Sequence, residues 1–179
     1  MFCISAIFLL IFFGVSTSFA RVQPPVLHSY ASVLERVLPT VVVVNATKVS
    51  QYVSNKGRVS KKSSFYGSGI VVRHNGYIVT SYHLIEHASS ISVTLHNEKK
   101  YEAKMVSFDT DTDIAIIKIT ADNHDVMTFA DSDKTKVGDV VLAIGNPFSI
   151  GKTVSQGIIS AVNKRRNGLQ QYEQFILTD

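Results

Sequence analysis

The apolar positions of this chain fall mainly into short β-branched runs separated by turn residues. Two such runs, 69–72 and 77–80, flank His74-Asn75-Gly76, and Asn-Gly between apolar runs is a strong hairpin signal. A second hairpin is predicted for 91–95 and 101–106 around Asn97. Further strands are predicted at 41–49, 114–119, 140–144, 154–162 and 175–177. Strands at this spacing, with only brief helical pieces, favour an all-β barrel or sandwich.

Two segments depart from this strand pattern. Residues 29–38 place Val33, Leu34, Val37 and Leu38 on one face at helical spacing, and Pro39 follows them. This spacing predicts one amphipathic helix that the proline ends. Residues 51–64 are polar and rich in lysine, and their composition predicts a loop.

The beginning of the chain differs from the rest. Residues 4–13 are almost wholly apolar. A membrane-spanning helix needs about 20 such residues, whereas a secretory leader needs only a short apolar core and then small residues such as Ala20. We therefore expect a signal peptide at 1–20, cleaved before Arg21, and a spacer at 21–28. Because no basic residue precedes the apolar run, an uncleaved inner-membrane anchor stays open. Either way the remainder is exported, to the periplasm or the medium.

Composition excludes several kinds of function. The chain has 179 residues and a formal net charge of +4, which fits one domain or a compact pair of subdomains. Aromatic and basic residues do not alternate as they would in a base-stacking surface, so no nucleic-acid partner is expected. The single cysteine, Cys3, lies in the leader. A mature chain would have no thiol, which excludes disulfides, thiol catalysis and cysteine-ligated zinc.

Two segments match part of a ligand-binding motif but lack residues that the motif requires. Residues 145–153 end in Gly-Lys-Thr, but Asn146 stands where a phosphate-binding P-loop needs glycine, and a strand is predicted to follow instead of a helix. Asp109, Asp111 and Asp113 alternate as at the start of a calcium loop. Such a loop needs glycine at its sixth position and glutamate at its twelfth, where this chain has Ile114 and Thr120. Neither nucleotide nor calcium is expected.

A zinc site is a further alternative. His83-Leu84-Ile85-Glu86-His87 fits the H-x-x-E-H pattern of some zinc peptidases. On a helix, His83 and His87 would share one face and hold a single zinc ion. The pattern also requires a long helix and a third ligand, and neither is evident. Zinc-dependent hydrolysis through these two histidines therefore stays an outside alternative.

A further series of motifs follows in order along the chain. Residues 67–72 (Gly-Ser-Gly-Ile-Val-Val) and 76–85 (Gly-Tyr-Ile-Val-Thr-Ser-Tyr-His-Leu-Ile) are similar to the segment around the catalytic histidine of the HtrA-type serine proteases. Residues 111–119 (Asp-Thr-Asp-Ile-Ala-Ile-Ile-Lys-Ile) resemble its catalytic aspartate segment. The stretches 137–148 and 153–160 match the second-barrel part that follows, and 175–179 the strand that leads into the nucleophile. The resemblance runs from about Ser29 to the end of the chain.

The resemblance implies an all-β, trypsin-like (chymotrypsin-fold) double β-barrel with a short N-terminal helix. A first barrel is expected at about 40–125 and an incomplete second barrel at about 135–179, so that 29–179 form one truncated protease domain. It also implies catalytic roles for His83 and Asp113. A histidine can accept a proton from a serine while a carboxylate holds its other nitrogen, which fixes the tautomer and stabilises the imidazolium. The order histidine, aspartate and then serine is that of chymotrypsin.

The nucleophile of that scheme is not in this sequence. In the family, Thr-Asp at the end of the last strand is soon followed by Gly-Asn-Ser-Gly-Gly, whereas here the chain ends at Asp179. Ser68 precedes the histidine, and Ser149 lacks the glycine that a nucleophile elbow has two residues earlier. We therefore expect a serine endopeptidase by descent that is inactive by itself. A non-enzymatic binding fragment is the alternative.

The partners expected also follow from the resemblance. A completed protease would act on exported polypeptides that are unfolded or misfolded. The family also implies a homo-oligomer, namely a trimer. No cofactor and no metal are expected. Membrane association is expected only through residues 1–20.

Overall fold

The computed structural model describes residues 29–54, 57–122, 124–146, 151–164 and 175–179. The chain divides into two units, Met1–Tyr30 and Ala31–Asp179, and the fold described here is that of the second unit. The predicted signal peptide and spacer, as well as Cys3 and Ser149, lie outside the described residues.

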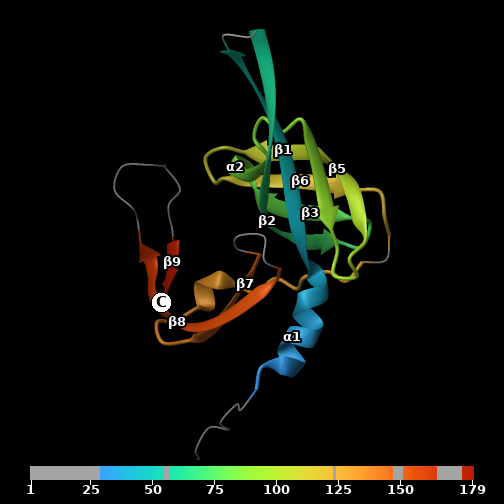
Figure 1. Ribbon diagram of the computed structural model, residues 1–179. Coiled ribbons are helices and arrows are strands. Elements are labelled where there is room, and N and C mark those ends of the chain that lie inside the picture. Colours follow the sequence, from blue (N-terminus) through green and yellow to red (C-terminus); the bar gives the residue numbers. More distant parts are fainter. Residues whose placement is uncertain (1–28, 55–56, 123, 147–150, 165–174) are drawn as a thin grey trace, which may run out of the picture. The chain divides into compact units, whose positions relative to one another are not determined.

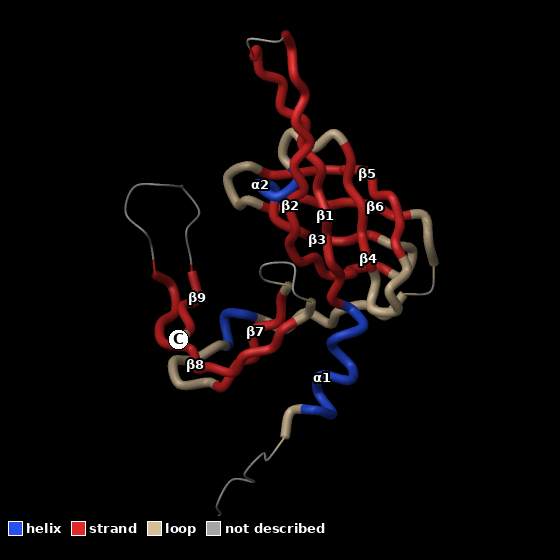
Figure 2. Tube along the Cα trace, in the orientation of Figure 1, coloured by secondary structure: helices blue, strands red, loops and turns tan. Residues whose placement is uncertain are grey.

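Six antiparallel strands close into a barrel in the order β1-β2-β3-β6-β5-β4 (Figures 1 and 2). The strands are β1 (Val41–Ser54), β2 (Gly57–Arg73), β3 (Tyr77–Ser81), β4 (Ser90–Thr94), β5 (Lys100–Asp109) and β6 (Ile114–Ile119). Closure gives each barrel strand two hydrogen-bonded neighbours, which removes the exposed edges of an open sheet. The prediction of an all-β barrel is confirmed.

Alternation along the strands fills the barrel. On β6 every second residue is buried, and this places Ala115, Ile117 and Ile119 inside. Ile78 of β3 and Val93 of β4 are likewise fully buried. Branched side chains suit this interior because they pack well on a pleated strand, and burying each large one contributes about 1.5–3 kcal/mol. The remaining members of this core are Val42, Val44, Ala46, Val71, Leu84, Ile85 and Leu95.

The predicted hairpin turn at 74–76 is confirmed. Gly76 has a φ of +87°, and its N–H donates to the carbonyl of Arg73 at 3.0 Å. A Cβ at this position would lie 2.7 Å from the carbonyl oxygen of Ile119, so the turn needs glycine for both conformation and space. The second predicted hairpin is also present, and the N–H of Leu95 donates to the carbonyl of Lys99 at 2.9 Å where it closes.

The loop predicted at 51–64 is wrong. Within the described residues, β1 and β2 continue past the barrel and pair throughout this region, with Val49 opposite Lys62 and Val53 opposite Arg58. Both faces of this extension meet solvent, so its polar side chains lose no hydration when the strands pair. Composition alone therefore could not reveal the strands, because the alternation rule depends on one face being buried.

The predicted N-terminal helix is present, with shorter bounds. Helix α1 spans Ala31–Val37 and passes into the 3₁₀ turn η1 (Leu38–Thr40), which contains Pro39. The α-helical hydrogen bonds end before the proline, as expected from the clash between proline and the residue before it. Val33, Leu34 and Val37 are the half-buried side chains of α1, which is the predicted face. In the described part of the chain, no helix is long and apolar enough to cross a membrane.

The second half of the unit contributes an antiparallel sheet in the order β7-β8-β9. These strands are Val140–Gly145, Thr153–Lys164 and Phe175–Thr178, and the 3₁₀ turn η2 (Ser132–Lys134) precedes them. All three strands were predicted. Strand β8 begins directly after Lys152, so the Gly-Lys-Thr segment leads into a strand and not into the helix that a P-loop requires.

Replacing Ile117 with alanine should lower the free energy of unfolding by about 2–5 kcal/mol, because it opens a cavity in a closed, filled barrel. Ile117 is fully buried, whereas its register partner Met105 on β5 is 47% exposed. Met105→Ala should therefore cost less than about 1 kcal/mol. Urea unfolding followed by circular dichroism would measure both, and equal losses would contradict the barrel core described above.

Candidate active site

A short helix presents His83 at one end of the barrel. Helix α2 (Tyr82–Ile85) follows β3 directly, and its Leu84 and Ile85 are buried in the core. Gly67 makes room for Leu84, since a Cβ on Gly67 would lie 2.6 Å from Leu84 Cδ2. With the helix held in this way, the His83 side chain points outward and is 74% exposed.

Strand pairing brings Asp113 to the same end of the barrel. Ser81, the last residue of β3, lies opposite Ile114, the first residue of β6. His83 is therefore two residues past one strand end, and Asp113 is one residue before the other. The register of the β3–β6 pair is what makes the two side chains neighbours.

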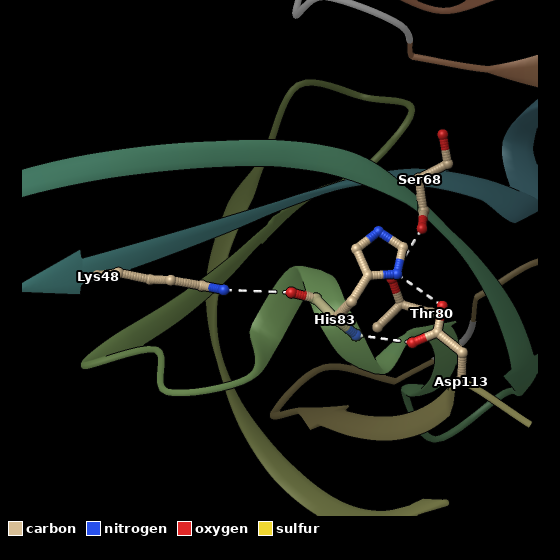
Figure 3. Close-up of polar contacts among 5 residues, drawn as sticks. All are labelled: Lys48, Ser68, Thr80, His83 and Asp113. Atoms are coloured by element: carbon tan, nitrogen blue, oxygen red, sulfur yellow. Dashed lines mark hydrogen bonds and ion pairs between the residues drawn. The ribbon is translucent and has the colours of Figure 1, made fainter. Parts of the chain in front are cut away.

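Three hydrogen bonds join the two segments, and Figure 3 shows the two that the carboxylate accepts. His83 Nδ1 lies 2.6 Å from Asp113 Oδ2, and the backbone N–H of His83 donates to Asp113 Oδ1 at 2.8 Å. The backbone N–H of Tyr82 donates to the carbonyl of Asp113 at 3.0 Å. Both carboxylate oxygens are thus occupied, which fixes the plane of the carboxylate against the imidazole and makes Nδ1 the protonated nitrogen of a neutral ring.

The backbone of Asp113 contributes to this geometry. Its φ is +57°, in the left-handed region, where aspartate is one of the few side chains found with any frequency. The turn before it is held by Asp109, whose carboxylate accepts from the backbone N–H of Asp111 at 3.0 Å and from Thr112 Oγ1 at 2.8 Å. Asp109 therefore serves as a turn residue, while Asp113 faces the histidine.

The pKa of Asp113 is lowered from its ordinary value. Partial burial by itself would raise this pKa, but it is outweighed by the hydrogen bonds from the backbone and ring of His83, by the charge of His83 and by a hydrogen bond from Tyr82. Asp113 is therefore held as a carboxylate near neutral pH, which is the state that can stabilise an imidazolium.

Two further contacts position α2 from outside the barrel interior. Lys48 of β1 donates from Nζ to the carbonyl of His83 at 3.1 Å (Figure 3). The Lys48 ammonium also lies 5.1 Å from the centre of the Phe65 ring. The ring of Tyr82 stacks on Phe108 with centroids 4.5 Å apart. A cation near the last carbonyls of a helix is favourable. Lys48 was not predicted from the sequence, and no local motif marks it, because it is 35 residues from His83.

Ser68, which the sequence offered as an alternative nucleophile, is engaged elsewhere. Ser68 Oγ accepts from the backbone N–H of Asn146 at 2.9 Å, and the carbonyl of Ser68 accepts from Thr80 Oγ1 at 2.8 Å. Figure 3 shows the Ser68 hydroxyl directed away from the imidazole. The structure thus does not bring Ser68 to His83 as a nucleophile.

The pair of histidines considered for zinc does not share a helix face. Helix α2 ends at Ile85, and His87 lies beyond it with a φ of +56°. His87 Nε2 is 3.5 Å from Glu86 Oε1, whereas His83 contacts Asp113. Over the described ranges, no group of three or more histidine, cysteine, aspartate or glutamate side chains is placed to hold a metal ion.

A cavity of about 550 Å³ adjoins the pair on the side of Asp113. Asp113, Thr112 and Ser68 contribute its polar wall. Its apolar wall includes Val79 from the barrel and Leu142 and Ile144 from β7. This cavity was not predicted from the sequence, because its walls come from strands far apart in the chain.

A closed six-stranded barrel with a histidine–aspartate pair at one end, followed by an antiparallel sheet, defines the trypsin-like class of peptidase domains. The sequence profile of that class, the trypsin-like peptidase domain, matches residues 67–179. Among curated proteins, the chain is 43% identical over 122 residues to the probable periplasmic serine endoprotease DegP-like of Chlamydia trachomatis, covering 68% of this chain and 24% of that protein. It is 42% identical over 127 residues to the periplasmic serine endoprotease DegP of Escherichia coli K12, covering 70% of this chain and 27% of that protein.

Solved structures agree with these relatives. The HtrA-type protease AlgW with decapeptide matches with a TM-score of 0.73 and 36% identity, covering 84% of this chain and 51% of that one. A variant of the same protease matches with a TM-score of 0.78 and 35% identity, covering 83% and 50%. The chain belongs to the HtrA-type serine proteases and carries their trypsin-like domain. It spans about a quarter of the length of the two curated relatives named above, 24% and 27%.

Replacing Asp113 with asparagine should lower stability in a pH-dependent way. Asparagine keeps the size and tolerates the left-handed backbone, but loses the charge. Because the folded-state pKa of Asp113 is lowered, the stabilisation from its carboxylate is present above the unfolded-state pKa of about 3.9 and is lost as pH falls through the folded-state pKa. The difference in unfolding free energy between the two chains should therefore shrink as pH is lowered from about 5 toward 2.

Urea titrations at a series of pH values would measure that difference. Asp122→Asn, at an exposed carboxyl, is the matched control and should produce a smaller and flatter difference. A gap for Asp113→Asn that does not change with pH would argue against the charge-assisted contact with His83.

Proposed function

We propose that these residues supply the proton-transfer half of a serine endopeptidase, with His83 as general base and Asp113 as the residue that orients it. The observation that carries the proposal is the 2.6 Å contact between His83 Nδ1 and Asp113 Oδ2, in a site where the His83 side chain is 74% exposed. Nδ1 is engaged by the carboxylate, so Nε2 is the nitrogen left to face a nucleophile.

The chemistry follows from this arrangement. A serine hydroxyl placed at Nε2 would lose its proton to the imidazole as it attacks the peptide carbonyl, and Asp113 would stabilise the resulting imidazolium. The same proton would then pass from Nε2 to the leaving amine, so the histidine ends the acylation step neutral. The lowered pKa of Asp113 supports this role, because the carboxylate has to stay ionised throughout.

We propose that the 179 residues by themselves hold no nucleophile for this pair. No Gly-Asn-Ser-Gly-Gly segment occurs in the sequence, and the Ser68 hydroxyl accepts a hydrogen bond from Asn146. We therefore propose that residues 1–179 alone do not cleave peptide bonds, and that the pair works with a serine and an oxyanion hole supplied by additional polypeptide. Without that polypeptide, the domain would act as a non-enzymatic binding module.

The biological setting is proposed from the leader and the relatives. An apolar segment before Ala20 supports export, and two relatives are named periplasmic endoproteases. We propose that residues 29–179 form the protease domain of an exported protein in the periplasm, acting on misfolded polypeptides, and that it assembles as a homotrimer. No cofactor enters this chemistry.

The activity proposal is tested with purified protein from residue 21 to 179. It should neither cleave casein nor react with a serine-directed fluorophosphonate. Appending a family-like segment that contains Gly-Asn-Ser-Gly-Gly and further barrel strands should give both activities. In that extended chain His83→Ala should abolish turnover, and Asp113→Asn should lower kcat by about 10⁴-fold, the loss known for this exchange in a triad protease.

Labelling of the unextended protein, if it is lost with His83→Ala, would show that a serine dismissed above is the nucleophile. Stoichiometric bound zinc that disappears with His87→Ala would instead favour a metallohydrolase.

The export proposal is tested by N-terminal sequencing of the protein from the cells that produce it. The mature chain should begin at Arg21, because small residues precede that bond. A membrane-bound species that retains Met1 would show the apolar segment to be an anchor.

A further inference from the structure

Strands β1 and β2 extend past the barrel as a two-stranded ribbon, here defined as residues 48–54 and 57–65 (Figures 1 and 2). Pairing of β1 with β4 ends at Thr47, and pairing of β2 with β3 begins at Gly69. In the described residues the outer edges of the ribbon therefore have no strand beside them, and their backbone N–H and C=O groups can pair with an added strand.

The ribbon lies in a segment of uniform charge. Between Arg36 and Ile85 every charged residue is basic, and all 14 acidic residues of the chain lie outside this stretch. Arg58, Lys61 and Lys62 are exposed, and none of them forms an ion pair within the described part of the chain. A segment with no carboxylate of its own repels other cations and attracts anions.

Each face of the ribbon carries both cations and apolar side chains. Lys61 lies opposite Ser50 and Lys62 opposite Val49, so the two consecutive lysines project to opposite faces. Tyr52 and Val53, which also project to opposite faces, are 51% and 80% exposed. Each face therefore offers a positive charge beside an apolar contact at the spacing of a β-strand.

The base of the ribbon is continuous with the candidate active site. Lys48, where the ribbon begins, donates to the carbonyl of His83 at 3.1 Å. Phe65, at the other base position, lies beneath the Lys48 ammonium and is 45% exposed. A chain bound along the ribbon would thus be led to the helix that carries His83.

We propose that the ribbon is a docking strand for extended, acidic polypeptide segments, which add to one of its free edges. This inference rests on the proposed function, since it names the class of polypeptide that the protease would capture. Edge pairing supplies main-chain hydrogen bonds of the kind used in β-strand addition, and the basic side chains select aspartate and glutamate at alternate positions. An anionic membrane would use the same cations but not the free strand edges, so the polypeptide is the occupant that accounts for both features.

Binding is measured directly on the full chain by fluorescence anisotropy. The probe is a labelled peptide about ten residues long with alternating threonine and glutamate. It should bind about tenfold more tightly than the same peptide with glutamine for glutamate, and this preference should fade at high salt because exposed charges are screened. A third peptide, N-methylated at every residue, keeps the charges but has no backbone N–H to donate to either strand edge, and it should bind about tenfold more weakly.

Two charge reversals locate the site. Lys61→Glu with Lys62→Glu should weaken binding of the acidic peptide about tenfold or more. Lys99→Glu with Lys104→Glu, at exposed positions on the β4–β5 turn and on β5, makes the same change in net charge and should alter binding less than about twofold. Circular dichroism of each variant would show that the fold is retained.

The outcomes separate the alternatives. Equal weakening by both double reversals, or no preference for glutamate over glutamine, would overturn the proposal. So would tight binding of the N-methylated peptide, or sedimentation with phosphatidylglycerol vesicles that depends on Lys61 and Lys62 while the acidic peptide fails to bind. Because the assay needs no cleavage, a failure here leaves the His83–Asp113 proposal standing, and a failure of that proposal leaves the binding result unchanged.

Discussion

The arrangement of this domain depends on the closure of a six-stranded barrel around branched side chains. Closure fixes which strands are neighbours, and the β3–β6 pair sets Ser81 opposite Ile114. His83 and Asp113 are one or two residues from those strand ends, so their separation is a consequence of strand register. A shift of that register by one residue would turn Ile78 and Ile117 out of the core, which is why the position of the pair is held by hydrophobic burial.

The polar contacts of the site orient the His83 and Asp113 side chains that the barrel brings together. Two donors from His83 occupy both oxygens of the Asp113 carboxylate, and the left-handed backbone of Asp113 directs that carboxylate at the histidine. Both side chains are accessible to water, so the contact contributes less to stability than a buried pair would. The contact between His83 and Asp113 instead orients the imidazole and keeps the carboxylate ionised. The same accessibility leaves the imidazole open to a reaction partner.

The ribbon differs from the barrel that it extends in how its side chains are buried. In the barrel, buried residues alternate with more exposed ones, most clearly along β3 and β6. In the ribbon both faces meet water, and the pairing is held by the backbone ladder that continues from the barrel. Serine and lysine are tolerated there for that reason. The result is a long, positively charged element whose base contacts the helix that carries His83.

The sequence alone determined the barrel strands, their first hairpin and the family. Alternating branched residues predicted the barrel strands, Asn75-Gly76 predicted their first hairpin, and the motifs around His83 and Asp113 indicated the family. These signals are local, because they reflect which side of a strand is buried or which residue a turn can accept.

Only the tertiary structure decided the rest. It joined 51–64 into paired strands, which no burial pattern marks, and it placed Lys48 on the carbonyl of His83 across 35 residues of chain. It also bound the Ser68 hydroxyl to the backbone of Asn146, a partner 78 residues away, and thereby separated that serine from the imidazole. These contacts depend on strand register and on the path of the chain between distant segments. Neither property can be inferred from the residues that form the contacts.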